Sequence, residues 1–174
     1  PQRAQGSAAQ RQGALLRVCG FRPCERIWLA SVAAAALRCP EPSGACRLLD
    51  PAERPAYAAL LQACHGLPAE VAAVVAAAFL PERPLLLVGG GVQLQTFAVG
   101  AEGTVPLATI TALLWQPDGA GAWPCGALLW LGTHPAHRRQ GHGTEVTAAA
   151  CRWLQQRGAA RLHVQAAAVT SVPW

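Results

Sequence analysis

The chain has 174 residues, of which 52% are hydrophobic and only 13% are charged, and its formal net charge at pH 7 is +5. This balance predicts a packed core and excludes a chain that is disordered over most of its length. No apolar run reaches the roughly eighteen residues that a membrane-spanning helix needs, so we expect no membrane insertion. The positive charge comes from arginine alone, which suits an anionic ligand but does not by itself argue for direct nucleic-acid binding.

Two helices are predicted in the first part of the chain. Residues 24–38 carry apolar side chains at helical spacing, and residues 52–65 form a second helical stretch that Gly66 should end. The stretch between them, residues 39–51, contains prolines, serine and glycine and is predicted to be a loop.

A third helix and an antiparallel meander should follow. The helix is expected over residues 68–79, between prolines. The sequence then becomes rich in branched and aromatic residues, which predicts strands at 85–88, 92–99 and 105–115. The turn at residues 101–103 should join the last two strands as a hairpin.

The last part of the chain predicts a strand, a loop, a helix and another strand. Residues 125–131 are almost continuously apolar, as in a central strand, and residues 145–156 have one apolar helical face. Gly158 should end that helix before a short strand at 161–164. The complete order indicates an α/β fold with a mixed sheet and a ligand loop at the carboxyl end of a strand.

The loop after residue 131 has the pattern of a pyrophosphate-binding segment. Arg138, Gly141 and Gly143 are spaced so that two glycines allow the backbone to approach a ligand closely. The helix that begins there offers free N–H groups and the positive end of its dipole, which together favour a phosphate.

This segment resembles the acetyl-CoA motif of the GCN5-related N-acetyltransferase (GNAT) superfamily. The similarity covers residues 131–154, with Arg138, Gly141 and Gly143 at its core, and continues into 158–164 as the next helix end and strand. It implies a mixed, mostly antiparallel sheet flanked by helices, truncated at the carboxyl end. It also implies an enzyme that moves an acetyl group directly from acetyl-CoA to an amine in a ternary complex.

The resemblance also implies roles for individual residues. The backbone at the strand end would meet the acetyl-pantetheine arm through Leu131, Gly132 and Thr133. The loop amides would wrap the pyrophosphate, and they belong to Arg139, Gln140, Gly141, His142, Gly143 and Thr144. Arg138, which precedes them, would shape the loop or pair with phosphate.

A narrower resemblance, to plant and algal acetyltransferases that follow a PHD finger, involves residues 18–27, 77–81 and 166–174. It implies a histone lysine as acceptor and a nuclear location; without it we expect an intracellular, cytoplasmic enzyme. The predicted organisation has three parts: a linker or tail of a preceding zinc-finger-like module at 1–23, a helical segment at 24–66, and the acetyltransferase domain at 67–174. Because the chain opens on Pro1 and stops at Trp174, we expect a fragment that is incomplete at its carboxyl end.

Zinc is a further possibility that the cysteines raise. Cys19 and Cys24 could be half of a zinc site in the preceding module, or a local site could use Cys39, Cys46 and the Cys64-His65 pair. Neither set has standard spacing, and unliganded thiols in a reducing compartment are the alternative. His134, His137 and His142 are predicted to be solvated loop histidines rather than metal ligands.

The sequence does not identify the catalytic acid and base. Glu102 and Asp118 fall in predicted turns, Glu145 belongs to a first helical turn, and Tyr57 lies far upstream of the position at which the family often carries an acid. Two alternatives therefore stay open: a CoA-binding or chromatin-interaction module without catalysis, and a small-molecule amine acetyltransferase.

Overall fold

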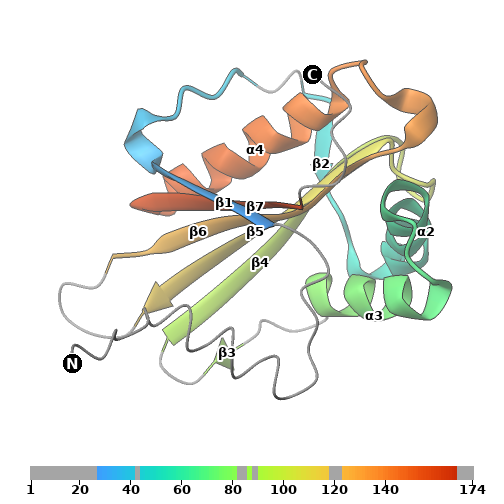
Figure 1. Ribbon diagram of the computed structural model, residues 1–174, viewed down its shortest axis with the longest axis horizontal. Coiled ribbons are helices and arrows are strands. Elements are labelled where there is room, and N and C mark those ends of the chain that lie inside the picture. Colours follow the sequence, from blue (N-terminus) through green and yellow to red (C-terminus); the bar gives the residue numbers. More distant parts are fainter. Residues whose placement is uncertain (1–26, 42–43, 82–85, 88–89, 118–122, 168–174) are drawn as a thin grey trace, which may run out of the picture. The chain divides into compact units, whose positions relative to one another are not determined.

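A mixed β-sheet organises the computed structural model (Figure 1). The structure describes residues 27–41, 44–81, 86–87, 90–117 and 123–167, and residues 29–165 form one compact unit. Within the described residues the sheet has seven strands in the order β1-β7-β6-β5-β4-β2, with β3 paired to β4. The strands are β1 (Ile27–Ala33), β2 (Cys46–Leu48), β3 (Leu86–Leu87), β4 (Gly90–Val99), β5 (Ala108–Pro117), β6 (Cys125–Thr133) and β7 (Arg161–Ala167).

Most of these strands run antiparallel, and one pair is parallel. β2, β3 and β5 are each antiparallel to β4, and β5 is antiparallel to β6. β6 and β7 are parallel, so the chain must cross over between them, and it does so through α4 (His142–Gln156). The sheet and the helices that flank it give the mixed α/β architecture that the sequence predicts.

Helices cover both faces of the sheet. Phe97 and Val99 point into an apolar core shared with α4, whereas their neighbour Ala98 packs with α2 (Arg54–His65) and α3 (Ala69–Phe79). Successive residues of a strand point to opposite faces, so α4 covers one face and α2 with α3 covers the other. Figure 1 shows α2 and α3 side by side, away from α4.

Capping residues explain where α2 begins and ends. Asp50 caps the 3₁₀ helix Pro51–Glu53 by accepting a hydrogen bond from the Ala52 amide, and Glu53 completes a capping box. α2 follows directly and ends at Gly66, whose φ of 64° is the left-handed conformation that favours glycine. The predictions of helices at 52–65 and 68–79 are confirmed.

The predicted helix over residues 24–38 is wrong. Residues 27–33 form the strand β1, followed by the 3₁₀ helix Ala34–Ala36. Its alanines favour a helix locally, but the segment gains backbone partners by lying next to β7 at the edge of the sheet. The predicted loop at 39–51 likewise contains the short strand β2, which pairs with β4.

The remaining predicted elements are found close to their expected bounds. The hairpin of β4 and β5 and the order β6, loop, α4, β7 are confirmed. Residues 1–23, the turn at 118–119 and the segment 168–174 lie outside the described residues. No helix among those that the structure describes is long and apolar enough to cross a membrane.

Candidate functional site

β6 and β7 are paired at only one end. The parallel pairing runs from Cys125 opposite Arg161 to Leu128 opposite Val164, and no further β6–β7 pair is found among the described residues. Both strands continue, β6 to Thr133 and β7 to Ala167. The carboxyl part of β6 therefore presents backbone groups that the sheet does not use on that side, at the edge where α/β sheets bind ligands.

A β-bulge interrupts β6 on its other side. The register passes from Leu129 opposite Thr111 to Gly132 opposite Thr109, so two residues of β6 oppose one of β5. Trp130 lies in this bulge with a φ of 51°, which is uncommon for a bulky side chain. The extra residue changes the alternation of the strand and places Gly132 on the face that α2 covers.

The loop after β6 turns tightly into α4. His134 begins the 3₁₀ helix Pro135–His137, and its Nδ1 accepts a hydrogen bond from the Ala136 amide at 3.3 Å. Arg139 and Gly141 then adopt positive φ values of 61° and 84°. Because Gly141 is the N-cap of α4, no N-cap side chain competes for the first-turn amides, which remain suited to an anion.

Glycine is needed where this loop meets the strand. A Cβ atom on Gly143 would lie 3.0 Å from Oγ1 of Thr133, so the first turn of α4 packs closely on the end of β6. At Gly141 the positive φ is the constraint, since no atom of the described residues lies within 4 Å of a Cβ position there. The space beside Gly141 is thus open as far as the described part of the chain shows.

The predicted acetyl-CoA-binding residues lie along this one path, from the end of β6 into α4. The exposed members of the set are Leu131, Arg138, Arg139, Gln140, Gly141 and Thr144. Nε of Arg138 lies 3.5 Å from the backbone oxygen of Thr133, so this arginine bridges the loop and the strand.

The carboxyl end of α2 lies directly over Gly132. A Cβ atom on this glycine would be 3.2 Å from Sγ of Cys64 and 3.4 Å from Nε2 of His65. Partial burial and the positive charge of Arg138 both lower the pKa of His65. The sequence raised His65 only as a zinc ligand and missed its position beside the ligand loop.

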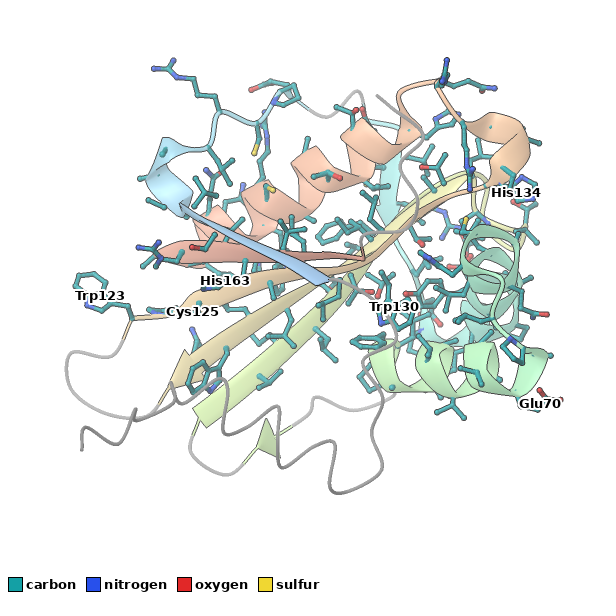
Figure 2. The ribbon with its side chains drawn as sticks, in the orientation of Figure 1. Glu70, Trp123, Cys125, Trp130, His134 and His163 are labelled. Carbon is teal, nitrogen blue, oxygen red and sulfur yellow. The ribbon has the colours of Figure 1, made fainter. Side chains whose placement is uncertain are left out.

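Aromatic rings connect this helix end to the bulge. The rings of His65 and Trp130 meet edge to face with centroids 5.5 Å apart, and those of Phe79 and Trp130 are 6.3 Å apart. In Figure 2, Trp130 lies where the sheet approaches α2 and α3. These contacts join α2 and α3 to the bulge of β6.

Buried hydroxyl groups lie deeper under α2. Tyr57 is fully buried, its hydroxyl is 3.3 Å from Oγ1 of Thr111, and Oγ1 of Thr111 is 2.9 Å from Oγ1 of Thr96. Burial raises the pKa of Tyr57 to about 12. Oγ1 of Thr109, next to Gly132 in the register, has no hydrogen-bond partner among the described residues. Tyr57 is thus a core group.

The described carboxylates do not supply an evident base. Glu53 is bound by Arg47 through two 2.7 Å contacts, and this ion pair lowers the pKa of Glu53 to about 2. Glu102 is exposed in the β4–β5 turn, Glu145 lies in the first turn of α4, and Asp118 is outside the described residues.

The local zinc site is not formed. No group of three His, Cys, Asp or Glu side chains within the described residues is placed to hold a metal ion. The imidazole rings of His134 and His137 are 5.5 Å apart, and those of His137 and His142 are 6.5 Å apart. Burial raises the pKa of Cys46 to about 11 and of Cys151 to about 12, so both thiols stay protonated at neutral pH. Cys19 and Cys24 lie outside the described residues.

Comparisons with known proteins agree with this geometry. The family model described as the acetyltransferase (GNAT) family matches residues 90–173, slightly less than half of the chain. This match agrees with the family and the enzyme class that the sequence motif predicts. No curated protein matches the chain significantly in sequence.

Solved structures share the fold at low sequence identity. A ribosomal-protein-alanine N-acetyltransferase from Brucella melitensis biovar Abortus 2308 is 16% identical with a TM-score of 0.54, covering 72% of this chain and 82% of its own. An aminoglycoside 6'-N-acetyltransferase from Acinetobacter haemolyticus is 18% identical with a TM-score of 0.53, covering 73% and 81%. A GCN5-related N-acetyltransferase from Kribbella flavida is 22% identical with a TM-score of 0.51, covering 82% and 49%. At these identities the likeness establishes the fold.

Proposed function

We propose that this chain transfers the acetyl group of acetyl-CoA to a primary amine, with a protein lysine as the acceptor. The observation that carries the proposal is the open start of α4 beside the part of β6 that β7 does not pair. This arrangement offers a phosphate site and free strand backbone within one short segment.

The residues present fit the cofactor. A pyrophosphate needs closely spaced amides and a positive potential, and the loop supplies both through Arg138, Arg139, Gly141 and the first turn of α4. A pantetheine arm needs an unpaired strand edge, which the end of β6 supplies. When bound, acetyl-CoA would bring an acetyl thioester to this strand edge.

The chain's own groups would then do three things. The loop and α4 would fix the phosphates and so hold the thioester carbonyl group in place for the acceptor. Binding of the cofactor would then supply much of the entropic cost of bringing amine and thioester together. Backbone amides between Leu131 and Thr133 would stabilise negative charge that develops on the carbonyl oxygen. The aromatic surface of Trp130 and Phe79 would hold the approaching amine on the α2 and α3 side.

The acceptor class stays a proposal. A histone lysine, a nuclear location and a preceding PHD finger all depend on the narrower sequence resemblance. The structural neighbours include one enzyme named for a protein acceptor and one named for an aminoglycoside. A small-molecule amine is therefore the alternative acceptor.

A CoA-binding module without catalysis is the second candidate function. It is favoured by the described carboxylates, because Glu53 is held in an ion pair and Glu102 lies exposed in a turn. Binding of acetyl-CoA without acetylation of any amine would support this candidate.

Calorimetric titration with acetyl-CoA tests the cofactor site. We expect Arg138→Ala to weaken binding about tenfold and Gly141→Trp about 100-fold or more, because they remove a charge and fill the open cradle. Arg157→Ala is the matched control: this arginine stacks on Trp153 at the other end of α4 and should leave binding unchanged. Wild-type affinity in both loop variants would contradict the proposal.

Mass spectrometry of acetylated products tests the acceptor. Histone-tail peptides, a polyamine and an aminoglycoside would be offered with acetyl-CoA under the same conditions. We expect the peptides to be acetylated fastest. Faster acetylation of a small amine would replace the protein acceptor with the alternative.

A further inference from the structure

His65 is held at the point where the acceptor and the end of β6 would meet. It is the last residue of α2, and the left-handed Gly66 that follows stops the helix there. Its ring contacts Trp130 in the bulge, with 5.5 Å between centroids and an interplanar angle of 81°. Its Nε2 lies 3.4 Å from the position that a Cβ of Gly132 would take.

Three features of the chain converge on this imidazole. The bulge brings Trp130 and Gly132 to the α2 face, the missing Cβ of the glycine lets the end of α2 approach the strand closely, and that helix end places a titratable nitrogen over the strand. Gly132 is also one of the residues predicted to meet the acetyl-pantetheine arm.

We propose that His65 is a catalytic residue that accepts the proton of the acceptor amine through its imidazole. The inference rests on the proposed function, since it names the base for that acetyl transfer. Neither the sequence motifs nor the family match assigns this role to a residue of α2.

The charges around the ring favour a neutral imidazole ready to accept a proton. Arg138 faces it from the loop, and its positive charge together with partial burial lowers the pKa of His65. The neighbouring Cys64 thiol has a raised pKa, mainly because of burial, and stays uncharged. Trp130, which faces the ring from β6, carries no charge.

The proton and electron balance of the step is complete. An ammonium group gives one proton to His65 and becomes a neutral amine. The nitrogen lone pair forms the new bond to the acetyl carbon, and the carbon–sulfur bond breaks with its electron pair on sulfur. The nitrogen loses its remaining extra proton and the sulfur gains one, so the products are an amide and a free thiol.

Other titratable groups nearby are less suited to this task. The Tyr57 hydroxyl is fully buried and contacts Thr111. Glu53 is held by Arg47, and Cys64 keeps its proton because burial raises its pKa. Among these groups His65 alone combines a side chain that can exchange a proton near neutral pH with a position beside Gly132.

Replacement of the imidazole tests the proposal by kinetics. We expect His65→Gln to lower kcat by about 100-fold or more, the usual scale for loss of a general base, with the Kd of acetyl-CoA unchanged. The acidic limb of the wild-type pH–rate profile should disappear in this variant. His163→Gln is the matched control, because His163 is exposed on β7, opposite Ala127 in the half of β6 that β7 pairs.

Rescue and titration separate a catalytic role from a structural one. Free imidazole should restore part of the activity of His65→Ala in a concentration-dependent way. In NMR titrations the His65 ring should have a lower pKa than an exposed histidine, and that pKa should rise in Arg138→Gln. The ring signals should also shift when acetyl-CoA is added.

The possible outcomes distinguish the inference from the function on which it rests. Full activity in His65→Gln, or ring signals that ignore acetyl-CoA, would overturn the role of His65 and leave the acetyltransferase intact. A wild-type chain that binds no acetyl-CoA or acetylates no amine would overturn the proposed function itself.

Discussion

The two halves of β6 differ although they belong to one strand. From Cys125 to Leu128 the strand is paired with β5 on one side and β7 on the other. From Leu129 to Thr133 it is bulged against β5, has no β7 partner among the described residues, and ends in the loop to α4. The backbone of the first half is used on both sides by the sheet, whereas the backbone groups of the second half on the β7 side are available to a ligand.

Each half contains a glycine, and the two glycines serve different purposes. Gly126 faces α4, where a Cβ would lie 2.9 Å from Cδ1 of the fully buried Leu154. Gly132 faces α2, where a Cβ would approach Cys64 and His65. The same residue type therefore allows close core packing against α4 in one half, and in the other it allows the end of α2, with His65, to approach the candidate site closely. Substitutions at the two positions should separate stability from activity.

Gly126→Val should have the largest effect on stability. The valine side chain cannot fit beside Leu154, which has no free space because it is completely buried, so we expect the free energy of unfolding to fall by about 3 kcal/mol. Urea denaturation measures this loss. The affinity for acetyl-CoA, measured on the folded protein, should be unchanged.

A double variant controls for this packing argument. Leu154→Ala alone should destabilise the core, but in the Gly126→Val background it makes the space that the valine needs. The two changes together should therefore cost less than the sum of the single changes. Strict additivity would mean that the two side chains do not compete for the same space.

The sequence predicts the parts of this contrast that depend on neighbouring residues. The apolar run of β6, the glycines at 141 and 143 and the helical periodicity of α4 all lie within one short segment. Local propensity and capping are sufficient there, because the strand, loop and helix follow directly from one another. The position of the loop in the chain therefore follows from the local sequence.

The parts that depend on distant residues could not be predicted in the same way. The bulge at Trp130 has no glycine to mark it, and its register is set by pairing with β5. His65 reaches Gly132 only through the packing of α2 on the sheet. The alanines of β1 favour a helix locally, whereas the neighbouring β7, which makes it a strand, lies more than a hundred residues away in sequence.

The ion pair of Arg47 and Glu53 should make the stability of the fold sensitive to acid. Arg47 also donates to the backbone oxygen of Gly100, which ties the β4–β5 turn to the segment before α2. The pKa of Glu53 is lowered from 4.5 to about 2, so its stabilising effect is complete above about pH 4.5 and is lost as pH falls toward 2. We expect this loss to be about 2 kcal/mol in the free energy of unfolding.

Urea denaturation between pH 5 and pH 2.5, followed by circular dichroism, measures this dependence. Glu53→Gln should be less stable than wild type at pH 5 and should show a flatter pH profile, because the titrating carboxyl group is gone. Glu41→Gln is a control, since Glu41 is almost fully exposed and its contact to Arg152 is 3.5 Å. Parallel profiles for wild type and Glu53→Gln would contradict the assignment.

Gly132→Ala should have the smallest effect on stability and a selective effect on activity. The added methyl group would lie 3.2 Å from Sγ of Cys64 and 3.4 Å from Nε2 of His65, so the end of α2 must move by a few tenths of an ångström. Small displacements of a catalytic group are costly for turnover, and we expect kcat/KM to fall about tenfold while the free energy of unfolding changes by less than about 1 kcal/mol. Gly91→Ala is the matched control, because its nearest neighbour, Oε1 of Gln116, would be 3.9 Å from the new methyl group. If Gly132→Ala were instead as unstable as Gly126→Val and kept its turnover, the carboxyl half of β6 would serve packing like the amino half, and the contrast between them would be lost.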